Sequence, residues 1–252
     1  MVNFTISDMF ILFPLIFFAG FVDSIAGGGG LISLPAYLLI GLPSHNALAT
    51  NKLSSSIGTM ISTFKYGKRK YIVFEIAIFS IIFSFLGSYV GASIALMISE
   101  NRLRLIISIL IVIAGIFLTL KKIKLHDGIN LRISKKIIAS LIGFFIGMYD
   151  GFLGPGTGTF LIILYVNVLS LDYIKASGTT KIVNLASNTS ALVTFLVNGK
   201  VLFYIGFPAA LFSILGNWIG ASLAIKNKEK LIKPVILGVL FLLATKVVHD
   251  IV

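Results

Sequence analysis

Two lysines, Lys52 and Lys181, lie inside long apolar segments, where an ionisable side chain is costly and normally faces a cavity or a partner. Each lysine is followed by polar side chains three and seven positions on, a spacing that places them on one face of a helix. These are Ser55 and Thr59 after Lys52, and Asn184 and Asn188 after Lys181. A cation among neutral hydrogen-bonding groups is a suitable lining for a tetrahedral or pyramidal oxyanion.

Hydroxyl and amide side chains also stand beside both lysines in the sequence. These further candidates for the anion site are Thr50, Asn51, Thr179 and Thr180. The alternative is that each lysine extends its charged end to a lipid headgroup, and this alternative is stronger for Lys52, which lies near the start of its segment. The deeper position of Lys181 favours a role in binding.

Asp23 and Asp150 each precede a glycine-rich stretch by a few residues. A carboxyl group in a low-dielectric site can hold a proton near neutral pH, so both are candidates for carrying a coupled proton. The alternative is that each carboxylate accepts hydrogen bonds from nearby backbone N–H groups or pairs with a lysine. The sequence leaves both alternatives open.

The two glycine-rich stretches, at 27–30 and 154–158, are unsuited to the interior of a continuous helix. Within a membrane, unpaired backbone is tolerated only where protein buries it or where it lines a wet cavity. A helix that restarts after such a stretch directs free N–H groups into that cavity, which favours an anion. The alternative for one stretch alone is a close packing point between helices. The residues predicted to contribute to the site here are Gly29, Gly30, Gly156, Thr157 and Gly158.

These residues must be positioned by apolar segments that are long enough to cross a bilayer as helices. Such segments are predicted at 9–26, 46–64, 71–98, 104–121, 137–153, 176–197, 201–225 and 234–250. Two shorter apolar segments, at 31–41 and 157–170, follow the glycine-rich stretches and are short for a full crossing. The sequence lacks the alternation of a barrel strand, so the predicted fold is an all-α polytopic membrane protein.

The composition supports a membrane protein and excludes several other classes. Of the 252 residues, 57% are hydrophobic and 12% are charged, and the mean hydropathy is +1.03. These values exclude a disordered chain, and the absence of cysteine excludes disulfides and thiolate metal sites. Three scattered histidines and the lack of a nucleotide-binding loop predict neither metal nor cofactor. The net charge of +12 is attributed to basic loops beside membrane spans, not to nucleic-acid binding.

The two halves of the chain carry the same motifs in the same order. Gly20 aligns with Gly147 and Asp23 with Asp150, and further matches follow at offsets of 127 to 129 residues. Interrupted helices at matching positions of two repeats are typical of transporter binding sites. The predicted organisation within one membrane domain is a first repeat at 1–125, a basic cytoplasmic linker at 126–136 and a second repeat at 137–252.

The distribution of basic residues predicts that the two repeats are inverted. Of the 21 Lys and Arg residues, 15 fall in loops assigned to one side of the membrane, three in loops on the other side and three within apolar segments. Basic loops mark the cytoplasmic side, so both termini are predicted to be extracytoplasmic. Counting each short segment as a crossing gives an odd number per half, which turns the second repeat upside down.

These motifs make the chain similar to the sulfite exporter TauE/SafE family of membrane permeases over nearly its whole length. The first half carries GFVDSIAGGGG from Gly20 and ALATNK from Ala47. The second half carries the more specific motifs, DGFLGPGTG from Asp150 and KIVNLASN from Lys181. The resemblance implies a transporter of sulfite, sulfonates or related sulfur-containing anions, driven by protons or the membrane potential and not by ATP.

The prediction is a secondary transporter of sulfite or an organosulfonate, with alternating access, in the plasma or inner membrane of the cell. Its partners are the small anion and the lipid bilayer, nucleic acid is not expected, and a homo-oligomer remains open. An anion channel with the same pore lining is the alternative. An intramembrane enzyme would need converging catalytic groups, and beyond the two aspartates the sequence contains no such motif.

Overall fold

The computed structural model describes residues 5–109, 134–227, 230–231 and 234–235. Within these residues all regular secondary structure is helical, which confirms the predicted fold class for this part of the chain. In order, the helices are α1 (Ile6–Ala26), α2 (Gly30–Leu39), α3 (Ser44–Lys68), α4 (Phe74–Met97), α6 (Lys135–Phe152), α7 (Thr157–Asn167), α8 (Tyr173–Val197) and α9 (Phe203–Asn227). A further helical stretch at 100–109 follows α4.

Three of the described helices, α1, α4 and α9, are long and apolar enough to cross a membrane. Helices α3 and α8 have the same length as α9, 25 residues each, but they carry more polar side chains because they line the centre of the bundle. Most of the predicted spans 104–121 and 234–250 and of the linker 126–136 lies outside the described residues.

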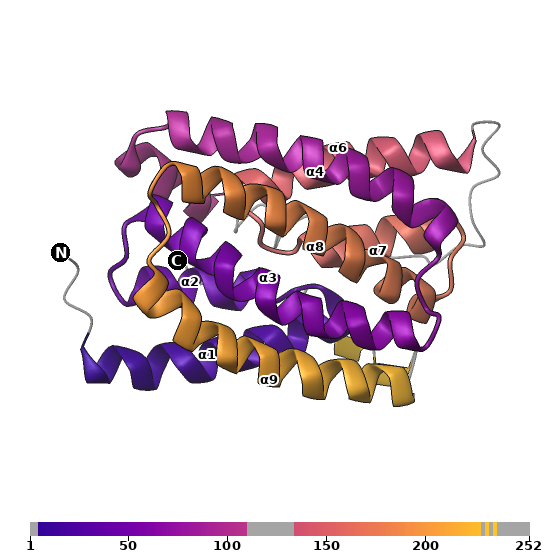
Figure 1. Ribbon diagram of the computed structural model, residues 1–252, viewed down its shortest axis with the longest axis horizontal. Coiled ribbons are helices and arrows are strands. Elements are labelled where there is room, and N and C mark those ends of the chain that lie inside the picture. Colours follow the sequence, from indigo (N-terminus) through magenta and orange to yellow (C-terminus); the bar gives the residue numbers. More distant parts are fainter. Residues whose placement is uncertain (1–4, 110–133, 228–229, 232–233, 236–252) are drawn as a thin grey trace.

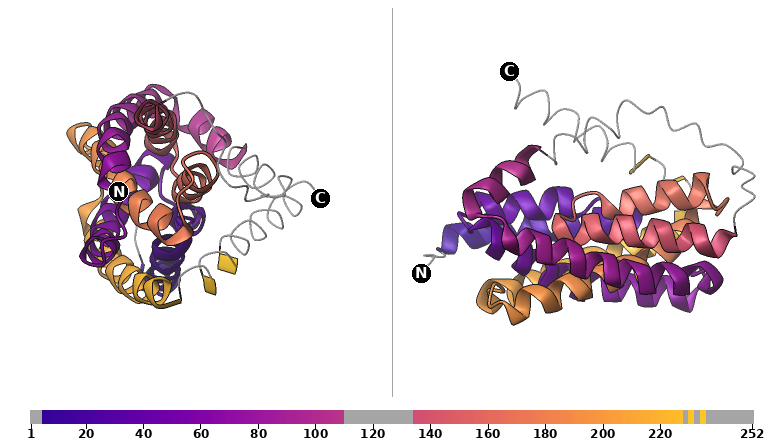
Figure 2. Two further views of the ribbon diagram at one scale, coloured as in Figure 1. Left: turned by 90° about the vertical axis from the view of Figure 1, so that its right-hand side faces the viewer. Right: turned by 90° about the horizontal axis from the view of Figure 1, so that it is seen from above.

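The long helices lie side by side along the longest axis of the molecule (Figures 1 and 2). Helices α3 and α8 cross at the centre and run in opposite directions. Near one end of the bundle Asn46 donates a hydrogen bond to the carbonyl of Lys200, just beyond α8, and near the other end the hydroxyls of Tyr66 and Ser177 are 3.2 Å apart. Corresponding helices of the two halves are therefore antiparallel at this contact.

Two parallel helix pairs, α1 with α9 and α4 with α6, flank this central crossing. Glycines allow the close approach: a methyl group added to Gly143 would lie 2.5 Å from the carbonyl oxygen of Ser80, and one added to Gly20 would lie 2.7 Å from that of Ser213. Gly87 and Gly91 pack in the same way against the α6 backbone, as Gly216 and Gly220 do against α1. Each pair joins one half of the chain to the other by backbone-to-backbone packing.

Both glycine-rich stretches separate a long helix from a short one. Helix α1 ends at Ala26, because Gly27 adopts the left-handed conformation (φ 76°) that terminates helices, and α2 begins at Gly30. In the second half α6 ends at Phe152 and α7 begins at Thr157, after Gly154 (φ 93°) and Gly156 (φ 80°). Helix α2 extends towards the end of the bundle where α1 begins, and α7 extends towards the opposite end (Figures 1 and 2).

The two stretches contact each other at the centre of the molecule. Gly27 lies against the backbone of Gly158 so closely that a side chain at either position would collide with the other chain segment. The hydroxyl of Thr159 donates a 2.9 Å hydrogen bond to the carbonyl of Ala26, which would otherwise be an unpaired acceptor at the end of α1. The starts of both short helices are thereby held beside the α3–α8 crossing.

Candidate functional site

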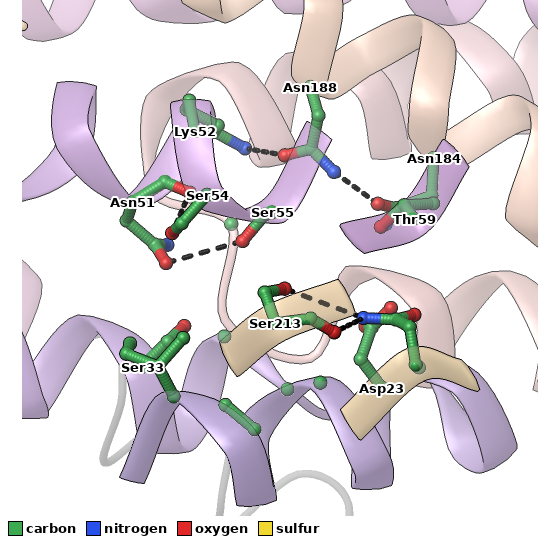
Figure 3. A pocket seen from close by; sticks show the side chains of 18 of the residues that line it. Asp23, Ser33, Asn51, Lys52, Ser54, Ser55, Thr59, Asn184, Asn188 and Ser213 are labelled. Atoms are coloured by element: carbon green, nitrogen blue, oxygen red, sulfur yellow. Dashed lines mark hydrogen bonds between the residues drawn. The ribbon is translucent and has the colours of Figure 1, made fainter. Parts of the chain in front are cut away.

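A pocket at the centre of the bundle contains most of the charged and amide side chains singled out from the sequence (Figure 3). Six helices and both glycine-rich stretches surround it. Its polar lining residues are Asp23 from α1, Ser33 from α2, Asn51, Lys52, Ser54, Ser55 and Thr59 from α3, Asp150 from α6, Asn184 and Asn188 from α8, and Ser213 and Asn217 from α9. Gly20, Gly27, Gly29, Gly30 and Gly154, with Ile16 and Ala19 of α1, complete the lining.

Lys52 forms a fully buried ion pair across the two halves of the chain. Its ammonium lies 2.9 Å from the carboxylate of Asp150, and the two side chains are 2% and 3% exposed. The same ammonium donates a 2.9 Å hydrogen bond to the amide oxygen of Asn188. Burial of two charges is tolerated because each satisfies the other and further hydrogen bonds complete the shell.

Lys181 forms the corresponding pair with the aspartate of the first half. Its ammonium lies 3.0 Å from the carboxylate of Asp23 and also donates to the backbone carbonyl of Asp23. The lysine side chain is fully buried, whereas that of Asp23 is 16% exposed. Lys181 itself lies behind its carboxylate partner and is not among the residues that line the pocket.

Each lysine is therefore paired with the aspartate of the other half, and the four charges sum to zero. In this structure each of the two carboxylates, Asp23 and Asp150, pairs with a lysine. Asp150 also accepts a 2.9 Å hydrogen bond from the hydroxyl of Thr157 at its Oδ1 atom. Its other oxygen, Oδ2, is buried and lacks a hydrogen-bond partner among the described residues, so that oxygen retains capacity for a proton or a donor.

Thr50 and Thr179 contact the backbone outside the pocket instead of lining it. The Thr50 hydroxyl accepts a 3.1 Å hydrogen bond from the N–H of Leu202 ahead of α9, and the Thr179 hydroxyl accepts a 3.0 Å bond from the N–H of Val73 ahead of α4. Both therefore position the start of a helix in the opposite half of the chain. Thr180 is buried behind the pocket, and its hydroxyl lacks a hydrogen-bond partner among the described residues.

The glycine-rich candidates divide into two groups. Gly29 and Gly30 line the pocket, whereas Gly156, Thr157 and Gly158 do not. Gly158 is pressed against Gly27, and the hydroxyl of Thr157 donates to the carbonyl of Gly154 at 2.7 Å as well as to Asp150. In this conformation the start of α7 supports the ion pair, and its backbone donors do not face the cavity.

Two polar positions on α9, Ser213 and Asn217, line the pocket but are absent from the sequence-based set. Asn217 donates a 3.0 Å hydrogen bond to the carbonyl of Ser213, and its amide oxygen is buried without a hydrogen-bond partner among the described residues. The buried hydroxyl of Ser33 on α2 is likewise unpaired. The available signal was the pair of polar residues four positions apart in an otherwise apolar helix.

The cavity enclosed by these groups is small, about 30 Å³, which is the volume of roughly one water molecule. Its walls supply ammonium, amide and hydroxyl groups, together with the carboxylates that form ion pairs with the lysines. Within the described residues, His, Asp and Glu side chains do not gather in threes as a metal site would require. The arrangement is suited to holding a small polar ion after the ion pairs rearrange.

Known membrane transporter proteins are similar to this chain over most of its length. The family model of the sulfite exporter TauE/SafE matches residues 12–247. The Escherichia coli K12 protein named "Probable membrane transporter protein YfcA" is 34% identical over 241 residues, covering 95% of this chain and 89% of that protein. A Haemophilus influenzae protein named "Probable membrane transporter protein" is also 34% identical over 241 residues, covering 95% and 94%.

A more distant relative is the Bacillus subtilis "Probable membrane transporter protein YdhB", 22% identical over 244 residues, which cover 92% of this chain and 98% of that protein. No solved structure matches the chain. The names of the relatives describe transport across a membrane and not catalysis, and the similarity inferred from the motifs is confirmed by the match across almost the whole chain. The chain belongs to the sulfite exporter TauE/SafE family of membrane proteins.

Proposed function

We propose that this chain is a secondary transporter that exports a small sulfur-containing oxyanion, sulfite or an organosulfonate, across the cell membrane by alternating access. The observation that carries the proposal is the pair of buried lysines, each neutralised by an aspartate of the opposite half beside a helix interruption. The family description supplies the sulfur-containing substrate class.

The charges of the site support binding of an anion together with a proton. The four ionised side chains are neutral as a set, so an anion bound beside Lys52 would leave one uncompensated negative charge. At an effective dielectric constant of about 20, two negative charges about 4 Å apart repel by roughly 4 kcal/mol. Protonation of Asp150 or Asp23 removes this repulsion and releases a lysine for the anion, so both aspartates remain candidates for proton coupling.

The proposed anion shell combines charged and neutral donors. Lys52 and Lys181 supply positive charge, and the amides of Asn51, Asn184 and Asn188 supply directional donors at the α3–α8 crossing. The backbone N–H groups of the interrupted helices add further donors once the starts of α2 and α7 separate. If the anion moves without a proton, the membrane potential contributes to export, because a negative interior favours outward movement of an anion by about 2.3 kcal/mol per charge per 100 mV.

Alternating access follows in this proposal from two inverted repeats with helices interrupted at the glycine-rich stretches. The antiparallel contact of α3 with α8 and the opposite directions of α2 and α7 support such an inversion. The cavity of about 30 Å³ is smaller than an organosulfonate and favours a carrier, which closes around its substrate, over a continuously open channel.

At one end of the bundle α3 and α9 finish and α4, α6 and α8 begin. The proposed orientation places this end in the cytoplasm. We refer to it as the basic end. Its described cations are Lys65, Lys68, Arg69, Lys70, Lys135, Lys136, Lys175 and Lys226. The opposite end carries Arg102, Arg104 and Lys200. This asymmetry supports a cytoplasmic basic end and extracytoplasmic termini.

The test is flux of sulfite and of organosulfonates into liposomes that contain the purified protein. We expect saturable flux. It should respond to a pH gradient if the anion moves with one proton, because the pair carries no net charge, and to an imposed potential if the anion moves alone. Lys181→Ala should abolish flux, and Lys181→Ala/Asp23→Asn, which keeps the site neutral, should fold but remain inactive. Lys175→Gln, an exposed lysine paired with Asp172, is the matched control.

Two outcomes would overturn parts of this proposal. Wild-type flux in Lys181→Ala would show that the charge of this lysine is not used. Flux that does not saturate at low millimolar anion and ignores a pH gradient would establish an anion channel with the same lining instead of a carrier.

A further inference from the structure

A second cavity lies at the basic end of the bundle, between the last turns of α3 and α9, and shares no residue with the central pocket. Its volume is about 580 Å³. It is lined by Phe64, Lys65, Lys68, Arg69, Tyr71, Trp218, Ser222, Ile225 and Lys226. These side chains lie outside the central pocket, and orientation alone accounts for their charge but not for their gathering around one cavity.

The charge of this cavity is unbalanced. Four of its nine described lining residues are cationic, and these nine include neither Asp nor Glu. None of these four cations forms an ion pair with an acidic side chain of the described residues. Four neighbouring positive charges repel one another, and a multiply coordinated anion such as a phosphate would relieve that repulsion.

Lys65 is already held in place at the wall of the cavity. Its ammonium lies 3.6 Å from the centre of the Trp218 ring, donates a 2.8 Å hydrogen bond to the carbonyl of Trp218 and also donates to the hydroxyl of Ser222. These contacts occupy two of its three N–H donors and leave one for a ligand. The lysine is therefore fixed before a ligand arrives, which lowers the entropy cost of binding.

The surroundings of the cavity indicate a ligand that is both anionic and apolar. Phe64 and Trp218 in its wall are 66% and 53% exposed, and Leu215, one turn from Trp218 on α9, is 53% exposed. Trp is typical of the boundary between hydrocarbon and headgroups. Apolar side chains on the hydrocarbon side and cations on the water side match the two parts of a phospholipid.

We propose that this cavity binds the phosphate-bearing headgroup of an anionic phospholipid, with the acyl chains lying along the exposed apolar side chains of α3 and α9. Basic pockets between helices at the cytoplasmic surface are typical sites for such headgroups. The ligand would bridge Lys65 and Lys68 of α3 to Lys226 of α9. The proposal requires membrane insertion, but it does not depend on which anion the central site transports.

The experiment measures the thermal stability of the detergent-solubilised protein with added lipid. Phosphatidylglycerol should raise the unfolding temperature by about 5 °C or more at saturating lipid, and phosphatidylcholine should not. Lys65→Gln/Lys68→Gln/Arg69→Gln should lose this shift, measured against the unfolding temperature of the same variant in phosphatidylcholine, which the lost contacts of Lys65 with α9 should lower. Lys135→Gln/Lys136→Gln, which removes two cations of the same end outside the cavity, is the matched control.

The outcomes separate a lipid site from its alternatives. Lys226→Gln provides a second test on an exposed helix end if the triple variant fails to fold, and it should reduce the shift. An equal shift with inorganic phosphate alone would overturn the lipid proposal in favour of a free phosphate site. Equal shifts with both lipids, or an equal loss in the Lys135→Gln/Lys136→Gln control, would show that charge at this end acts without a specific cavity.

Discussion

Replacement of Asp150 by asparagine tests whether an anion and the carboxylate compete for Lys52. In the wild type the two side chains are 2.9 Å apart and almost fully buried, so a bound anion would lie within about 4 Å of the carboxylate. The resulting repulsion of roughly 4 kcal/mol corresponds to about a thousandfold in affinity. Removal of the Asp150 charge should therefore raise the affinity for an organosulfonate.

In Asp150→Asn this competition is absent. We expect its affinity near neutral pH to exceed that of the wild type by up to about a thousandfold. Methanesulfonate is a suitable probe because its own charge does not change near neutral pH. Calorimetry in two buffers of different ionisation enthalpy should show proton uptake on binding to the wild type and none with the variant.

Folding of the variant needs its own control, because Asp150→Asn leaves Lys52 buried without its counter-charge, a defect that typically costs about 3–5 kcal/mol. Asp150→Asn/Lys52→Gln removes both charges and should fold without binding the anion. Asp172→Asn, which removes an exposed pairing partner of Lys175, should behave as the wild type. Binding by Asp150→Asn that is no tighter than binding by the wild type would refute the competition.

Three further predictions concern the framework of the site. Gly91→Leu should strongly lower the unfolding temperature, because the α6 backbone fills the space beside Gly91, whereas Gly67→Ala, whose new methyl group meets one carbon of Ile72 at 3.4 Å, should not. Partial burial alone would raise the pKa of Glu100, but hydrogen bonds from residues at the start of α3 outweigh it and lower that pKa. The ionised carboxylate should therefore stabilise the fold fully above about pH 4.5, and this stabilisation should be lost as the pH falls below that value. Glu100→Gln should therefore lower the unfolding temperature at pH 7, and this difference should shrink as the pH falls below about 4.5, measured by thermal denaturation in detergent. Thr50→Val and Thr179→Val should each destabilise the fold by about 1–3 kcal/mol through a lost hydrogen bond to a helix start, with the KM for the anion unchanged in liposome flux.

Helical geometry explains which candidate residues the sequence placed correctly in the pocket. Ser55 and Thr59 lie three and seven positions after Lys52, within one face of α3, and all three line the cavity. Thr50 precedes Lys52 by two positions, which is a rotation of about 200° around the helix. Its hydroxyl therefore points to the far side, and adjacency in the sequence was a misleading criterion.

The partners of the lysines depended on the tertiary arrangement and could not be derived from local sequence. The motifs placed each lysine and each aspartate in matching positions of the two halves, but pairing within a half or between halves requires knowledge of how the helices cross. Packing of Gly27 against Gly158 brings the two helix interruptions together, so each aspartate lies beside the lysine of the other half. Ser213 was missed because a single hydroxyl in an apolar helix is equally compatible with packing.

The two halves differ at positions that the repeat makes equivalent, and this difference predicts the second conformation. Ser213 on α9 packs beside Gly20 and lines the pocket, whereas its counterpart Ser84 on α4 packs beside Gly147 and does not line it. If the halves exchange conformations during transport, Ser84 should line a pocket when Ser213 is closed. The chain contains no cysteine, so Ser84→Cys and Ser213→Cys each introduce a unique thiol. A membrane-impermeant thiol reagent should label the two variants from opposite sides of the membrane, with labelling of Ser84→Cys increased by substrate that drives turnover. Labelling of both from the same side, or of Ser213→Cys alone during turnover, would contradict an exchange of conformations between inverted halves.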